Sequence, residues 1–111
     1  MAKPKAVLVY ITTSGPEEAR KIAGSLLEEN LIACGNILPK MESVYRWKGE
    51  VQYDNESVLI LKTIDENLSQ IENKVKELHS YDLPCLVSFP IDGGNREFIS
   101  WIVEESGSSM G

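Results

Sequence analysis

The stretch KAVLVYITTSGPEEARKIAGSLLEEN, residues 5–30, contains the first two elements of the predicted fold. Residues 5–13 are rich in β-branched side chains, which is typical of a mostly buried strand. Ser14 and Glu17 have the spacing of a capping box, which predicts a helix over about residues 16–30. Apolar residues recur there at intervals of three and four, so the helix buries one face. The residues of this face are Ala19, Ile22, Ala23, Leu26 and Leu27.

A long hairpin is predicted after this helix. The extended runs are residues 31–39, 41–47, 50–53 and 57–63, with breaks expected near Pro39 and near Asp54-Asn55. Lys48-Gly49 has the composition of a two-residue turn, which would pair Trp47 with Glu50. Extending this register pairs Arg46 with Val51, Tyr45 with Gln52 and Val44 with Tyr53. Tyr45 and Trp47 then share one face, and Val44, Val51 and Tyr53 share the other.

The second half of the chain continues the alternation of helix and strand. A helix over residues 65–79 is predicted, with Thr63 or Asp65 as its cap. Its apolar stripe consists of Leu68, Ile71, Val75 and Leu78. A strand over residues 83–91 and a short helix over residues 96–105 follow, and residues 106–111 are expected to form a frayed tail.

The predicted order is therefore β-α-β-β-α-β with an extra C-terminal helix. This order favours the α+β class and a ferredoxin-like βαββαβ sandwich, in which two helices cover one face of an antiparallel sheet. Each helix is expected to act as a crossover that makes the strands it joins parallel neighbours. Residues 1–111 are expected to form a single domain with a core over about residues 5–105.

Composition restricts the class of function. The chain has 111 residues with a net charge of −6, and an acidic surface repels phosphate, so binding to nucleic acid is not expected. Membrane insertion is not expected either, because no apolar run approaches the roughly 18 residues that a spanning helix needs. The start of the chain lacks the features of a signal peptide, and Cys34 and Cys85 form no disulfide framework. We therefore expect a cytoplasmic protein.

The sequence contains no recognisable catalytic motif. It has neither a Walker A sequence nor a G-x-G-x-x-G motif, and no nucleophile motif lies beside the single histidine, His79. With one histidine, a multi-histidine metal site within one chain is excluded. An enzyme that uses His79 as a general base is the weakest hypothesis, because no orienting group can be named. We predict that the protein is not an enzyme.

The corner over residues 77–85 (ELHSYDLPC) collects several potential ligands. Because a helix C-terminus favours a protonated imidazole, one interpretation of His79 is a cap of the second helix. The other is a soft-metal site in which His79 joins the Cys85 thiolate and a carboxylate. The spacing matches no closed metal motif, which favours the cap, but both interpretations stay open.

Five collinear stretches over about residues 6–103 resemble the CutA family, the divalent-cation tolerance proteins. They are LIACGNI at 31–37, SVYRWKG at 43–49, LKT at 61–63, LHSYDLP at 78–84 and PI-x-x-GN-x-x-FI-x-WI at 90–102. The resemblance implies a ferredoxin-like homotrimer similar to the PII signalling trimers, with hairpins that pair across subunits. It also implies a link to tolerance of copper and other divalent metals and, in animal members, to anchoring of acetylcholinesterase. No settled reaction accompanies the family.

The family's cleft between subunits implies a set of candidate ligand-binding residues. They are Tyr45, Trp47, Lys62, His79, Tyr81 and Asn95. The chain departs from the family pattern at Ser80, where the family commonly has proline, and at Cys85, where it commonly has glutamate. Cys85 thus removes an acceptor and adds a soft ligand. Of the three copper ligands invoked in the family, only His79 remains, because the other two positions hold Ile11 and Leu78.

Two functional hypotheses follow. The first is a trimer that binds copper, another divalent metal or a small ligand without catalysis, with His79 and Cys85 as metal ligands. The second is a structural or scaffold trimer that acts through protein partners. Both include a homotrimer, because residues 58–61 are continuously apolar and the hairpin is rich in aromatic residues. Closing three hairpins in a ring would cover these surfaces.

Overall fold

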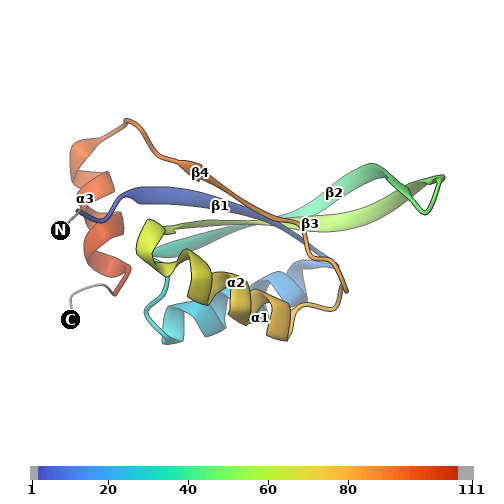
Figure 1. Ribbon diagram of the computed structural model, residues 1–111, viewed down its shortest axis with the longest axis horizontal. Helices are drawn as coiled ribbons and strands as arrows, with labels where there is room; N and C mark the ends of the chain where they lie inside the picture. Colours follow the sequence, from blue (N-terminus) through green and yellow to red (C-terminus); the bar gives the residue numbers. More distant parts are fainter. Residues whose placement is uncertain (1–2, 108–111) are drawn as a thin grey trace.

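The computed structural model describes residues 3–107, which form a four-stranded sheet with α1 and α2 on one face and α3 at one end (Figure 1). The arrangement confirms the α+β class and the ferredoxin-like order. The elements are β1 (Ala6–Thr13), α1 (Pro16–Glu28), β2 (Cys34–Trp47), β3 (Glu50–Ile64), a 3-10 turn (Asp65–Asn67), α2 (Leu68–Leu78), β4 (Leu86–Pro90) and α3 (Arg96–Glu105).

The strand order is β2-β3-β1-β4, and every neighbouring pair is antiparallel. The expectation that each helix joins parallel neighbours is therefore wrong. β1 and β2, which α1 joins, run in the same direction, but β3 lies between them. β3 and β4, which α2 joins, also run in the same direction, but β1 lies between them. β3 is thus a central strand, and it carries the buried residues Val58, Leu59 and Leu61.

The register of the hairpin confirms the predicted pairing of Trp47 with Glu50 and of Tyr45 with Gln52. Lys48 and Gly49 have φ angles of 51° and 83°, and a two-residue turn with two positive φ angles matches the right-handed twist of the strands. The turn therefore sets the register of the whole outer hairpin.

One of the two expected breaks in the hairpin is present. The register shifts between Leu38 and Met41, so that Pro39 lies in a β-bulge. The break expected near Asp54-Asn55 is wrong, because Asp54 pairs with Ser43 and Asn55 with Glu42 in an uninterrupted strand. Pairing across the hairpin outweighs the low strand propensity of Asp and Asn.

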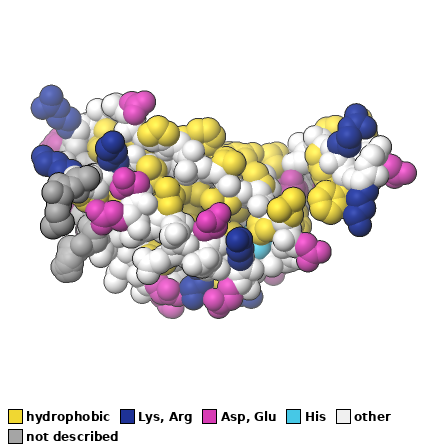
Figure 2. All heavy atoms as spheres, viewed as in Figure 1, with side chains coloured by type: hydrophobic (Ala, Val, Ile, Leu, Met, Phe, Trp, Pro, Cys, Tyr) yellow, Lys and Arg dark blue, Asp and Glu magenta, His cyan; other side chains and the backbone are white. Residues whose placement is uncertain are grey.

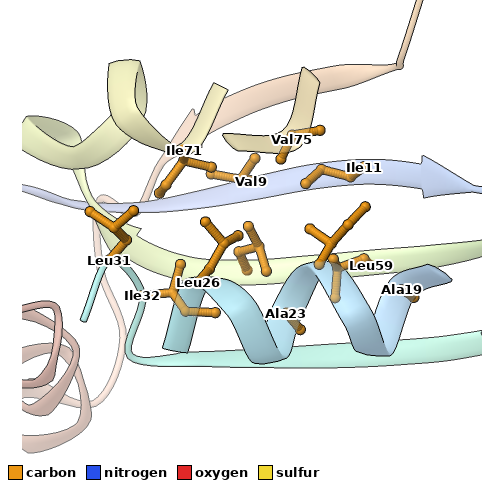
Figure 3. Packing of buried hydrophobic residues seen from close by; sticks show 12 residues of the cluster. Val9, Ile11, Ala19, Ala23, Leu26, Leu31, Ile32, Leu59, Ile71 and Val75 are labelled. Atoms are coloured by element: carbon orange, nitrogen blue, oxygen red, sulfur yellow. The ribbon is translucent and has the colours of Figure 1, made fainter. Parts of the chain in front are cut away.

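The core lies between the sheet and helices α1 and α2, as Figure 3 shows. Val9 and Leu61 are opposite each other in the sheet, and both are fully buried under the helices. Burying each such side chain contributes about 1.5–3 kcal/mol. The helices bury most of the stripes that their apolar periodicity predicted, with Ala19, Ile22, Ala23 and Leu26 from α1 and Ile71 and Val75 from α2. The prediction is wrong for Leu27, which is 46% exposed at the edge of the α1 stripe.

The predicted caps of both helices are wrong. α1 has Gly15 as its N-cap, and the residue that reaches back is Glu18, whose Oε1 accepts from Ser14 N–H at 2.9 Å. Because Pro16 takes the first helical position, the third helical position falls on Glu18 rather than on Glu17. α2 follows a 3-10 turn and has no side-chain cap.

The two predicted caps of α2 make tertiary contacts instead. Thr63 Oγ1 donates to Leu31 O at 2.6 Å, and Asp65 Oδ1 accepts from Lys5 N–H at 3.0 Å. Both side chains therefore bond to distant segments, at Leu31 and Lys5, and not to the first turn of α2.

The fraying expected from residue 106 is wrong for Ser106 and Gly107. Ser106 is fully buried, and its Oγ donates to Ile102 O at 2.6 Å. Gly107 has a φ of 68° and lies so close to Asn30 that an added Cβ would be 2.1 Å from the Asn30 carbonyl oxygen. Residues 108–111 lie outside the described residues.

Among the described residues, the other face of the sheet is covered by a helix only at the end where α3 packs against Ala6 (Figure 1). The residues that alternate with the core positions point to it, so that Leu8 is opposite Phe89 and Tyr10 is opposite Val87. In Figure 2, hydrophobic side chains form a band over the strands, while charged side chains lie over α1 and α2, at the α3 end and at the tip of the hairpin. None of the helices among residues 3–107 is long and apolar enough to cross a membrane.

Candidate functional site

A hollow of about 810 Å³ lies at the root of the β2–β3 hairpin. Its walls come from β1, from the facing strands of the hairpin and from the corner between α2 and β4, which lies below the hairpin root in Figure 1. The lining residues are Tyr10, Thr12, Ser43, Val44, Tyr45, Trp47, Asp54, Glu56, Ser80, Tyr81, Asp82, Leu83 and Cys85. The hollow therefore joins segments that are far apart in the sequence.

The hollow brings together four of the predicted site residues, namely Tyr45, Trp47, Tyr81 and Cys85. Lys62 lies six residues beyond Glu56 on β3, a separation of about 20 Å at 3.3 Å per residue. It contacts Asn36 and lies 5.9 Å from the centroid of the Phe98 ring.

Asn95 is the N-cap of α3, where its Oδ1 accepts from Phe98 N–H at 2.8 Å. Lys62 and Asn95 thus both lie near Phe98. Within one chain, they are separate from the other predicted cleft residues.

Two tyrosines in the hollow donate to carboxylates. Tyr81 Oη donates to Glu56 Oε2 at 2.8 Å, and Tyr45 Oη donates to Asp54. Burial, followed by the hydrogen bond to Glu56, raises the pKa of Tyr81, and the hydrogen bond to Asp54 raises the pKa of Tyr45. Both phenols therefore stay neutral at physiological pH and act as donors to the carboxylates.

Tyr81 is held in place by His79, whose side chain is fully buried. His79 Nδ1 accepts from Tyr81 N–H at 3.1 Å, and the ring centroids are 4.6 Å apart. With Nδ1 as an acceptor, Nε2 carries the proton and donates to Thr12 O at 2.7 Å. The imidazole thus links the end of β1 to the wall of the hollow.

These contacts bear on both interpretations of His79. His79 is the C-cap residue of α2, as one interpretation predicted, but its backbone N–H rather than its imidazole bonds to the helix, at Val75 O. Both ring nitrogens are engaged, so a metal bound to either would have to displace Thr12 O or Tyr81 N–H. Metal binding by His79 and Cys85 stays a prediction.

Glu18 of α1 binds the α2–β4 corner through its carboxylate. Its Oε1 accepts from Ser14 N–H and lies 3.7 Å from His79 Nδ1, while its Oε2 accepts from Ser80 N–H at 2.8 Å. Partial burial raises the pKa of Glu18, but the bonds from Ser14 and Ser80 together outweigh it, and the pKa lies below its ordinary value of 4.5. Glu18 is therefore ionised and ties α1 to the segment that carries Tyr81.

We predict that Glu18→Gln lowers the free energy of unfolding by about 1–2 kcal/mol at neutral pH. Because the pKa is lower in the folded chain than in the unfolded chain, the carboxylate stabilises the fold above pH 4.5. This contribution is lost as the pH falls through the lowered pKa. Urea unfolding of both proteins at a series of pH values measures the difference, which should shrink below pH 4.5. Glu17→Gln, at an exposed neighbour, is the matched control, and an equal loss there would contradict the prediction.

Sequence reasoning missed Asp54, Glu56 and Glu18 as site residues. The contact of Asp54 with Tyr45 could have been predicted from the register, because Asp54 follows Gln52 on the same face and therefore lies diagonal to Tyr45. The contact of Glu56 could not have been predicted, since its partner Tyr81 is 25 residues away. Only the tertiary structure shows that the α2–β4 corner reaches the hairpin.

The described residues contain no group of three or more His, Cys, Asp or Glu side chains that could hold a metal ion. Cys85 is an exposed free thiol in the hollow, and Cys34 is a half-buried free thiol on β2. A soft metal prefers thiolate and imidazole ligands. The single imidazole of the sequence, that of His79, has both ring nitrogens bonded, to Thr12 O and to Tyr81 N–H.

Residues 7–105 match the sequence profile of the family described as CutA1 divalent ion tolerance protein. The Divalent-cation tolerance protein CutA of Thermus thermophilus is 45% identical over 100 residues, which cover 90% of this chain and 97% of the relative. Protein CutA 1, chloroplastic, of Oryza sativa is 42% identical over 97 residues, or 87% of this chain. The chain spans about half of that relative (55%).

Solved structures agree with these sequence matches. The crystal structure of CutA1 from Oryza sativa superposes with a TM-score of 0.89 at 40% identity and covers 96% of each chain. The divalent cation tolerance protein from Thermus thermophilus has a TM-score of 0.89 at 44% identity over 92% of this chain and 99% of that one. The family description and the names of the Thermus thermophilus proteins state tolerance to divalent ions or cations. On the profile match and these likenesses, the chain belongs to the CutA1 divalent ion tolerance protein family.

Proposed function

We propose that this protein is a non-catalytic homotrimer that binds copper, another divalent metal or a small ligand in a cleft between subunits. The observation that carries the proposal is the acidic and aromatic hollow beside the uncovered face of the sheet. Asp54, Glu56 and Asp82 line it, and no Lys, Arg or His does. Such a lining attracts cations, in keeping with the divalent-cation tolerance named in the relatives.

Support for the homotrimer comes from apolar side chains that are exposed in a single chain. On the hairpin, Trp47 is 47% exposed and Tyr53 is 67% exposed, and on β4 Phe89 is 51% exposed. Exposed apolar groups that continue from the sheet face to the hairpin are typical of an interface between proteins. A second and a third copy of this chain are the partners proposed to cover them.

The cleft in this proposal is completed by a neighbouring subunit. Lys62 and Asn95 lie at the α3 end of the sheet, away from the hollow. They are therefore proposed to face the hollow from the adjacent chain. A metal ion would likewise take ligands from two subunits, with Cys85 as the exposed soft ligand. His79 would join only if its bond to Thr12 O or Tyr81 N–H opened.

Isothermal titration of Cu²⁺ into the protein tests the metal part of the proposal. We expect one saturable site per subunit, with affinity about 10- to 100-fold lower in Cys85→Ser, because a lost ligand weakens a metal site strongly. His79→Ala is expected to weaken binding as well. Cys34→Ser, which removes the half-buried thiol of β2, is the matched control. Absence of a saturable heat in the wild type would overturn metal binding, and unchanged binding in both variants would exclude these two ligands.

The scaffold alternative is favoured by one observation, which is the lack of a three-ligand metal group within residues 3–107. In that case the trimer would bind a protein partner whether or not metal is present. A pull-down with chelator-treated protein that recovers one stable partner, with loss of that partner in a monomeric variant, would favour the alternative.

A further inference from the structure

We propose that the cation held by the acidic hollow in the assembled protein is the Lys62 ammonium of the next subunit, and that a metal ion enters the hollow by displacing it. This inference rests on the homotrimer of the proposed function and adds an internal competitor for its cation site. In a single chain, charge is uncompensated on both sides of this contact. Asp54, Glu56 and Asp82 line the hollow, and the lining includes no Lys, Arg or His.

The three carboxylates of the hollow lack a cationic partner in a single chain. None of them takes part in an ion pair within residues 3–107. Glu56 and Asp54 accept hydrogen bonds from the neutral hydroxyls of Tyr81 and Tyr45. Like charges gathered in one hollow repel one another, and walls of low dielectric strengthen the field that they create. The hollow therefore favours a cation that comes from outside the chain.

Lys62 is a half-buried cation with unused donors. Its ammonium carries three N–H donors and bonds to Asn36 Oδ1 at 2.5 Å. Nζ also lies 5.9 Å from the centroid of the Phe98 ring, and it makes no ion pair within residues 3–107. Because Asn36 and Phe98 hold the side chain in place, little conformational entropy is lost when the ammonium binds a carboxylate.

Lys62 and the hollow lie at two ends of the same face of the sheet. In the register of β1 and β3, Lys62 is opposite Leu8, and Tyr10 and Thr12, which follow on the same face of β1, line the hollow. Glu56 is six residues before Lys62 on β3, a separation of about 20 Å at 3.3 Å per residue. Groups this far apart do not pair within one chain. They can pair between successive copies in a closed ring, because head-to-tail contacts join two different patches of the same chain.

A lysine in the hollow makes subunit association and metal binding compete. Both need the same carboxylates, so each lowers the affinity for the other by the same factor, as thermodynamic linkage requires. Lys62 also neutralises one of the three negative charges, which lowers the cost of burying this lining between subunits. The metal-free trimer is therefore the more tightly associated one.

Double-mutant cycles on the trimer test the pairing. Lys62→Met, which keeps the length and the apolar stem of the side chain, is combined in turn with Glu56→Gln, Asp54→Asn and Asp82→Asn. The trimer dissociation constant is taken from urea-induced dissociation, followed by light scattering at several subunit concentrations. We expect Lys62→Met and the change of its partner carboxylate each to raise this constant about 10-fold, and their combination to raise it little further. Groups about 20 Å apart within one chain act independently, so a failure to add reports contact between subunits.

Glu42→Gln, on β2 outside the hollow, is the matched control and should add to Lys62→Met without coupling. Additive effects of Lys62→Met with all three carboxylate variants would overturn the pairing and leave the homotrimer intact. A wild-type protein with the mass of one subunit would overturn both the pairing and the homotrimer. Circular dichroism of each variant checks that the fold is retained.

Titration of Cu²⁺ at a subunit concentration where all variants are trimeric tests the competition. We expect Lys62→Met to bind Cu²⁺ about 10-fold more tightly than the wild type, because the internal competitor is gone. Lys76→Met, at an exposed position of α2, is the matched control and should leave the affinity unchanged. Equal affinities of Lys62→Met and the wild type would overturn the competition. Absence of saturable binding in both would overturn the competition together with the metal part of the proposed function, while the cycles still decide the pairing.

Discussion

Replacing Trp47 with aspartate is expected to reduce the mass in solution from three subunits to one subunit of 12.4 kDa. Trp47 lies at the end of β2, next to the hairpin turn, and is 47% exposed in the single chain. In the proposed trimer a neighbouring subunit covers this ring, so an aspartate there would bury an unpaired charge in the interface. Multi-angle light scattering at micromolar concentration measures the mass directly.

Trp101→Asp is the matched control for this experiment. Trp101 is similarly exposed, at 40%, but it lies on α3 and stacks on Phe98 at 5.4 Å between centroids. We expect this variant to disturb the packing of α3 while the mass stays that of the trimer. A wild-type protein with the mass of one subunit and an intact fold would overturn the homotrimer. A trimeric Trp47→Asp variant would remove Trp47 from the interface.

Asn67→Ala is expected to lower the free energy of unfolding by about 2–3 kcal/mol, because it removes two buried hydrogen bonds. Asn67 is 8% exposed, and its Nδ2 donates to Leu31 O at 3.0 Å and to Ser106 O at 2.7 Å. It thereby joins the segment after α1 to the end of α3. Urea unfolding at a fixed subunit concentration measures the loss, since the stability of an oligomer depends on concentration.

Asn73→Ala provides the comparison for Asn67. Asn73 is exposed on α2, so we expect its replacement to change the unfolding free energy by less than about 0.5 kcal/mol. Similar losses in the two variants would show that the contacts of Asn67 with Leu31 and Ser106 contribute little.

The sequence predicted the candidate site in part. Tyr45 and Trp47 were found because the Lys48-Gly49 turn sets a register that places both on one face. The aromatic and thiol members of the α2–β4 corner were found as a cluster, and Tyr81 and Cys85 do line the hollow. The carboxylates opposite them were missed, because Glu56 meets Tyr81 only after β3 and the corner are brought together by the fold.

His79 shows the limit of local reasoning most clearly. Its position at the end of a helix predicted a cap, since the sequence shows only neighbours on the same segment. The ring instead bonds to Thr12, 67 residues earlier, and to the backbone of Tyr81. A buried imidazole takes the partners that its surroundings offer, and these come from β1 and α1 rather than from α2.

The helices, the strands, the buried faces of α1 and α2 and the hairpin register follow from the sequence alone. They depend on side-chain periodicity and on one turn, which are interactions within a few residues. The strand order, the contacts of Thr63 and Asp65, the burial of Ser106 and the hollow at the hairpin root were decided only by the tertiary structure. Each of these needs contacts between distant segments, such as β3 entering between β1 and β2 or Glu18 reaching Ser80. Such contacts are chosen by the packing of the whole sheet against both helices, and no local pattern in the chain encodes them.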